Sequence, residues 1–170
     1  MSVLDWPDIV LLATMLSAAI APFLWAQHSK TSVALATVLS LLLVSFVQFA
    51  ESILGGYAMS HSWLIDFLGI KPSIMTNPFE SYRMVTAAWL HADWFHVLLN
   101  ILVVALVGVP LEQRLGARRW MIVYFLGFMG GNIAWIISHP ESSIPAIGAS
   151  GAAFGILGAY MACWPEDKIE

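Results

Sequence analysis

The sequence predicts an all-α, polytopic membrane protein. Hydrophobic residues make up 59% of the 170 residues and charged residues 11%, with a mean hydropathy of +0.80. A soluble domain is about 45–50% apolar and about 25% charged, so this chain has too few charges to cover a surface in water. Five uncharged stretches lie along it: residues 9–27, 31–50, 94–111, 120–140 and 142–165. A spanning helix needs about 20 apolar residues and open sheet edges are not stable in lipid, so we expect a bundle of five spans.

The composition also excludes several classes of function. The net charge of −4 leaves no basic face for nucleic acid. Cys163 is the only cysteine, which excludes an internal disulfide framework and a thiolate metal cluster. His91 and His96 lack the i, i+4 spacing of a paired-histidine zinc helix. No metal and no cofactor is therefore implied.

The first stretch predicts a retained transmembrane helix rather than a secretory signal. The residues before it include Asp5 and Asp8 and no Lys or Arg, whereas a signal peptide begins with a basic region. Trp6 and Trp25 stand where interfacial aromatic residues are expected. We therefore place a helix over residues 9–25.

The distribution of Lys and Arg predicts the orientation. With the N-terminus outside, the inner side holds Lys30, Arg114, Arg118, Arg119 and Lys168. The outer side then holds only Lys71 and Arg83. Because inner loops carry the excess of basic residues, we expect a multi-pass protein of the cell membrane with its N-terminus outside.

The segment between the second and third predicted spans, residues 51–93, is an insertion rather than a plain loop. It is longer than ordinary connections and contains an apolar cluster around Trp63 and Phe67. We expect it to fold on, or partly in, the outer leaflet. A small extracellular cap is the alternative.

Polar side chains at membrane depth mark the third predicted span. His96 and Asn100 are four residues apart and share a helix face, and His91 lies near the same edge. Polar groups in a membrane are costly, so their default interpretation is functional. The alternative is that they only form hydrogen bonds between helices.

The fifth predicted span opens with Gly148-Ala149-Ser150-Gly151. Small neighbours would let a substrate backbone approach the serine hydroxyl, and a helix N-terminus offers N–H groups to a developing oxyanion. The alternative is structural, a stripe of small residues for close helix packing, made of Gly151, Gly155, Gly158 and Ala162.

Taken in order, these motifs resemble the rhomboid family of intramembrane serine proteases over about residues 32–165. The resemblance is carried by His91-Ala-Asp-Trp-Phe-His96-Val-Leu-Leu-Asn100, Glu112-Gln-Arg114-Leu-Gly116, Gly130-Gly131-Asn132 and Gly148-Ala-Ser150-Gly151-Ala-Ala-Phe-Gly155. Tyr82-Arg83 is similar to the family's Trp-Arg pair, with Tyr in place of Trp. The resemblance implies an extra N-terminal spanning helix and inner loop at residues 1–31, followed by an incomplete rhomboid-like domain at residues 32–170 with its insertion at 51–93.

The resemblance also implies roles for these residues. Ser150 would attack a peptide carbonyl of a transmembrane substrate and give an acyl-enzyme that water hydrolyses. His96 and Asn100 would form the oxyanion hole together with the Ser150 backbone N–H. His91, Gly148 and Gly151 would support this site, and Glu112 and Arg114 would form a structural pair at the inner end of the third span. The implied partners are transmembrane protein substrates and the lipid bilayer.

The chain departs from the family pattern at the general base. The family's base histidine lies two spans after the serine, and none of the five histidines here follows Ser150. We therefore expect a chain truncated before the base and inactive by itself. The alternative is a catalytically inactive rhomboid-like protein that binds transmembrane helices. A small transporter or channel subunit is disfavoured, because the sequence has no repeat pair and no carboxylate within a span.

Overall fold

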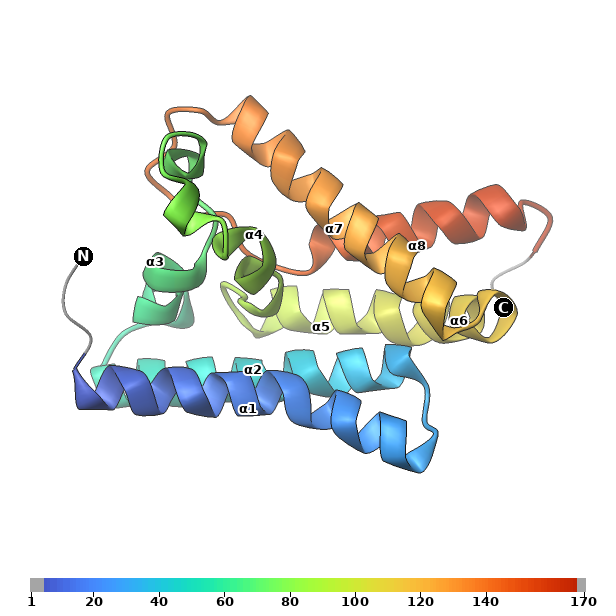
Figure 1. The fold of residues 1–170 in the computed structure, drawn as a ribbon, viewed down its shortest axis with the longest axis horizontal. Coiled ribbons are helices and arrows are strands. Elements are labelled where there is room, and N and C mark those ends of the chain that lie inside the picture. Colours follow the sequence, from blue (N-terminus) through green and yellow to red (C-terminus); the bar gives the residue numbers. More distant parts are fainter. Residues whose placement is uncertain (1–4, 168–170) are drawn as a thin grey trace.

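The computed structural model describes residues 5–167, and within them the chain is helical apart from turns and a single isolated bridge between Ile70 and Ala146. The helices are α1 (Trp6–Ser29), α2 (Val33–Gly55), α3 (Trp63–Leu68), α4 (Arg83–Thr86), α5 (Trp94–Val103), α6 (Val109–Leu115), α7 (Ala117–Ser138) and α8 (Ser150–Cys163) (Figure 1). The predicted all-α membrane bundle is confirmed.

Four helices are long and apolar enough to cross a membrane. They are α1, α2, α7 and the unit Trp94–Leu115, in which a π-helical turn at Val104–Gly108 joins α5 to α6. The fifth predicted span, residues 142–165, is helical only from Ser150. Its 14-residue helix α8 is about 21 Å long, shorter than the roughly 30 Å hydrocarbon core. Gly148, with φ of +110°, keeps the preceding residues out of the helix.

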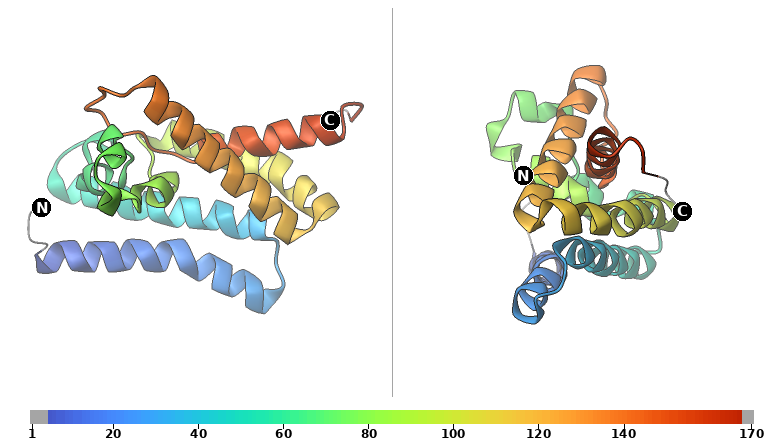
Figure 2. Two further views of the ribbon diagram at one scale, coloured as in Figure 1. Left: turned by 45° about the horizontal axis from the view of Figure 1, so that its top comes forward. Right: turned by 90° about the vertical axis from the view of Figure 1, so that its right-hand side faces the viewer.

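The first two helices form an antiparallel pair (Figure 2). A capping box between Asp5 and Asp8 starts α1, and Lys30 ends it in the left-handed conformation. The Ser40 hydroxyl of α2 donates to the Ala19 carbonyl of α1 at 2.8 Å. It also accepts from Trp89 Nε1 at 2.7 Å, which links the pair to the end of the insertion.

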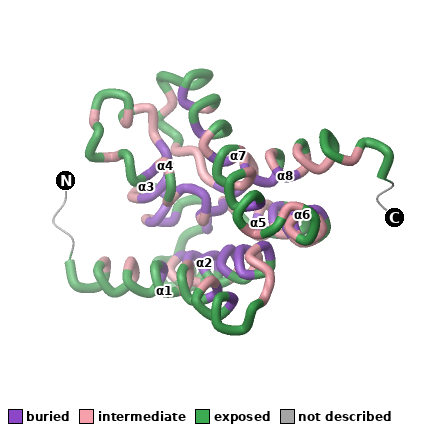
Figure 3. The backbone as a smooth tube through the Cα atoms, turned by 45° about the vertical axis from the view of Figure 1, so that its right-hand side comes forward, coloured by how far each residue is buried: buried purple, intermediate pink, exposed green. Residues whose placement is uncertain are grey.

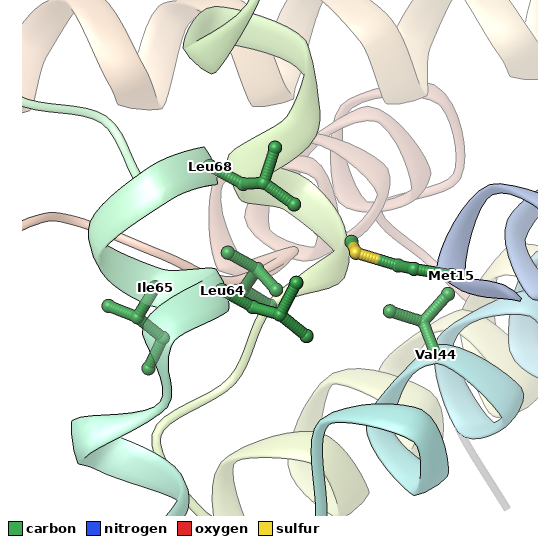
Figure 4. Close-up of a cluster of buried hydrophobic side chains, with 6 residues drawn as sticks. Met15, Val44, Leu64, Ile65 and Leu68 are labelled. Atoms are coloured by element: carbon green, nitrogen blue, oxygen red, sulfur yellow. The ribbon is translucent and has the colours of Figure 1, made fainter. Parts of the chain in front are cut away.

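The segment predicted as an insertion, residues 51–93, is folded, although its first five residues continue α2. Leu64, Ile65 and Leu68 of α3 pack against Met15 of α1 and Val44 of α2 in one buried cluster (Figure 4). The turns beyond α3 are fixed by Arg83, whose Nη1 donates to the carbonyls of Asp66 and Gly69, each at 2.8 Å. Apolar contacts therefore hold the insertion on both N-terminal helices, and the buried guanidinium of Arg83 joins the segments within it.

The predicted pairing of Glu112 with Arg114 is wrong for the described residues. The Glu112 carboxylate accepts from the backbone N–H groups of Val33 and Ala34, at 2.9 and 2.7 Å, and from the Ser32 hydroxyl. Arg114 forms an ion pair with Asp167 instead. The free N–H groups at the start of α2 attract the carboxylate more strongly than an exposed guanidinium does, because they lie in a partly buried setting.

Candidate functional site

Ser150 is the first residue of α8, a helix that begins near the middle of the molecule rather than at either end (Figure 1). Ala149 precedes it without any side-chain hydrogen bond to the helix, and the first helical bond runs from the Ala153 N–H to the Ala149 carbonyl at 2.9 Å. The N–H groups of Ser150, Gly151 and Ala152 therefore have no acceptor within the helix. These donors and the helix dipole make this end favourable for negative charge.

The loop before Ser150 is tied to the insertion by backbone bonds. The Gly148 N–H donates to the Ala87 carbonyl at 2.8 Å, and Ile70 and Ala146 exchange two bonds of 2.9 Å. The insertion thus positions the start of α8 directly.

Helix α8 crosses α7 through glycine backbones. A Cβ on Gly127 would lie 2.9 Å from the Gly151 carbonyl oxygen, and one on Gly155 would lie 2.8 Å from the Gly127 Cα. Gly131 faces Gly151 in the same way, at 3.0 Å. Gly151 and Gly155 therefore do pack as a small-residue stripe, whereas a Cβ on Gly158 would meet no atom within 4 Å. This crossing fixes the first turn of α8, and with it Ser150.

His96 lies against the loop that leads into Ser150. A Cβ built on Gly148 would be 2.7 Å from His96 Nε2 and 2.6 Å from Cε1, so the imidazole occupies the space that any side chain at position 148 would need. The positive φ of Gly148 excludes most other residues as well. The structure therefore brings His96 next to a residue two positions before the serine.

Asn100 lies one turn further along α5 and is buried. Its Nδ2 donates to the His96 carbonyl of the same helix at 3.0 Å. The Ser150 hydroxyl forms no hydrogen bond with any residue in the described range 5–167. The three residues predicted for catalysis thus belong to two helices in contact, without a hydrogen bond between the serine and the other two.

His91 is fully buried and held by its backbone. The amide of Gln48 accepts from the His91 N–H at 3.2 Å and donates to the His91 carbonyl at 2.7 Å. The His91 ring is 4.9 Å from the His96 ring, at an interplanar angle of 78°. Burial, assisted by the nearby His96, lowers the pKa of His91 to about 4. His91 is therefore a neutral support behind His96 at physiological pH.

Of two further supporting residues, Gln48 was not singled out in the sequence and Asn132 was named only as part of the family motif. Gln48 joins α2 to His91 and, through a 3.1 Å bond from Nε2, to the Met59 carbonyl. Asn132 of α7 donates to the Met84 carbonyl at 3.0 Å and so joins α7 to the insertion. Both are amides inside apolar stretches, the same signal that singled out Asn100.

Comparison with known proteins identifies the family. The Rhomboid domain model matches residues 78–170. The chain is 34% identical over 95 residues to Rhomboid-like protease 3 of Toxoplasma gondii, covering 56% of this chain and 35% of that protein. It is 37% identical over 82 residues to the Putative rhomboid protease YdcA of Bacillus subtilis, covering 48% and 41%. It is 34% identical over 94 residues to the Inactive RHOMBOID-like protein 8 of Arabidopsis thaliana, covering 55% and 26%.

The chain spans between 22% and 41% of the length of these and similar curated relatives. No solved structure matches it.

Proposed function

The chain belongs to the rhomboid family, and on that premise we propose that it carries the nucleophile and the oxyanion-stabilising part of an intramembrane serine protease. The observation that carries the proposal is the packing of the His96 imidazole on Gly148, beside the free N-terminal turn of α8 where Ser150 stands. A serine, a neighbouring side-chain donor and open backbone N–H groups are the parts that acyl transfer requires.

In the proposed reaction the Ser150 Oγ bonds to a peptide carbonyl carbon, and the carbonyl oxygen becomes an oxyanion. The N–H groups of the first turn of α8, together with the side chains of His96 and Asn100, would donate to it. Breaking the C–N bond releases the amine with a proton and leaves an acyl-enzyme, which water then hydrolyses. The base that takes the Ser150 proton is outside this proposal, because no residue in the described range bonds to that hydroxyl.

The substrates we propose are transmembrane helices of other proteins, cleaved near the outer surface. The loop that leads into Ser150 is hydrogen-bonded to the insertion, which lies on the outer side in the orientation given by the basic residues. We further propose that residues 1–31, with α1 and an inner loop, are additional to a rhomboid-like domain that begins at residue 32, before the family match at 78–170.

Labelling with a fluorophosphonate tests the nucleophile. The protein is extracted from its own membrane in mild detergent, and its intact mass is compared with 18.7 kDa. Probe labelling of the wild type is then compared with that of Ser150→Ala. Ser143→Ala is the matched control, because Ser143 is an exposed serine of the loop before α8. We expect labelling and cleavage of a model transmembrane substrate to be lost in Ser150→Ala alone. Labelling that persists in Ser150→Ala would exclude Ser150 as the nucleophile.

The second candidate function is binding of transmembrane helices without cleavage. It is favoured by the similarity to a relative named inactive. Here a model transmembrane helix would be retained equally by wild type and Ser150→Ala, and neither would cut it. Cleavage that depends on Ser150 would reject this candidate.

A further inference from the structure

One continuous apolar groove follows the face between the N-terminal helices and the rest of the bundle. Its wider part, about 710 Å³, is lined by α1, α3 and α4, and its narrower part, about 210 Å³, by α2, α4 and α7. Phe23, Val85 and Trp89 line both parts, so the two form one groove. Its walls are almost entirely carbon, which suits hydrocarbon.

The narrower part leads to the basic end of the molecule. Met121 and Phe125 of α7 line it, and Arg118 precedes them by three and seven residues, so Arg118 continues the same face of the helix. On the opposite wall, Lys30 follows Phe23 by seven residues. Both cationic side chains are exposed, and the turn after α1 and the start of α7 lie at one end of the bundle (Figure 1, Figure 2).

The start of α7 at this end is also open to an anion. Gly116 precedes α7 and supplies no side-chain cap, whereas the start of α2 is already satisfied by Glu112. Uncapped N–H groups and the helix dipole attract phosphate. Within residues 5–167, the ion pairs involve Lys71, Arg83 and Arg114, so neither Lys30 nor Arg118 is neutralised there.

We infer that the groove binds an anionic glycerophospholipid, with an acyl chain along α1 and α7 and its phosphate between Lys30, Arg118 and the start of α7. A partner helix does not fit the narrower part, because a helix is 10–12 Å across and this part has a volume of only about 210 Å³. The basic end faces the cytoplasm by the distribution of Lys and Arg, and that leaflet carries anionic lipid. The bound lipid would hold α1, most of whose residues are exposed, to the rest of the bundle (Figure 3).

Native mass spectrometry of the detergent-solubilised protein tests this inference. The protein is equilibrated with equal amounts of phosphatidylglycerol and phosphatidylcholine that carry the same acyl chains. We expect wild type to retain phosphatidylglycerol preferentially. Arg118→Gln and Lys30→Asn should each lower its retention about fivefold, the effect of one basic residue near a lipid surface. Asn is chosen at position 30 because it tolerates the left-handed backbone there.

Arg119→Gln is the matched control, because it removes the same charge from an exposed neighbour about 100° away around α7. It should leave retention unchanged. Val85→Phe narrows the groove where its two parts meet and should lower retention of both lipids, with the helix content checked by circular dichroism.

Three results would overturn the inference. They are equal retention of the two lipids by wild type, equal losses in Arg118→Gln and Arg119→Gln, and unchanged retention in a folded Val85→Phe variant.

Discussion

The N-termini of α2 and α8 differ in how their free N–H groups are treated. At α2, the Glu112 carboxylate and the Ser32 side chain accept from three N–H groups in the first turn. At α8, the methyl side chain of Ala149 offers no hydrogen-bond acceptor, and the N–H groups of the first turn stay open. A helix end without side-chain acceptors costs stability unless water or a ligand takes those bonds. The difference teaches that side chains satisfy the start of α2, whereas the start of α8 keeps the open donors that the proposed oxyanion site requires.

The largest effect is expected from removing the side-chain donor His96, which lies beside the uncapped start of α8. His96→Ala should lower the cleavage rate about 10²–10³-fold, because one oxyanion donor is lost. The free energy of unfolding should change much less, since His96 is only half-buried. Two quantities are measured for each variant: kcat with a model transmembrane substrate, and the free energy of unfolding from a urea titration.

Asn100→Ala extends the same comparison, with a similar loss of rate expected. Equal losses of folding and activity in either variant would instead favour a purely structural role in helix packing.

The next largest effect is expected from a substitution in the loop that leads into the uncapped start of α8. Gly148→Ala requires a side chain in a left-handed backbone and in the space of the His96 ring, so we expect about a 100-fold loss of activity. Gly158→Ala is the control, because a Cβ there meets nothing within 4 Å. Comparable activity in the two variants would show that the packing of His96 on Gly148 is unimportant.

At the capped start of α2 we expect the opposite result, a loss of stability without a loss of activity. Glu112→Ala leaves the N–H groups of Val33 and Ala34 without their acceptor and should lower the free energy of unfolding by about 2 kcal/mol. The fluorophosphonate labelling rate of the folded fraction should stay as in wild type. Glu112→Gln keeps an acceptor oxygen, so it should lose less stability, and a larger loss than in Glu112→Ala would contradict the capping role.

The smallest effect concerns the support behind His96. The pKa of His91 is about 4 when folded and near 6.5 when unfolded, so the unfolded chain binds more protons between these values. Stability from this group is complete above pH 6.5 and is lost as the pH falls towards 4. We expect about 1 kcal/mol less stability at pH 5.5 than at pH 7.5. The His91→Gln variant should lack this part of the pH profile, and identical profiles would refute the assignment.

The all-helical membrane fold could be predicted from the sequence because hydrocarbon thickness and the need to satisfy backbone groups leave few solutions. The positions of α1, α2 and α7 follow from their uncharged stretches. The length of α8 could not be predicted in this way, because hydropathy does not register the backbone conformation that Gly148 imposes. The family resemblance implied a pair of Glu112 with Arg114, whereas the groups that donate to Glu112, in Ser32 and Val33, are 80 and 79 residues away in the sequence.

The sequence by itself determined the class of protein, its family and the candidate residues Ser150, His96 and Asn100. These depend on residue type and local spacing, which are read without coordinates. The tertiary structure decided that His96 packs on Gly148, that Gln48 holds His91, and that α8 crosses α7 at glycines. It also decided that Phe23, Val85 and Trp89 join the two parts of the apolar groove. Each of these depends on contacts between distant segments, which only the packing of the helices determines.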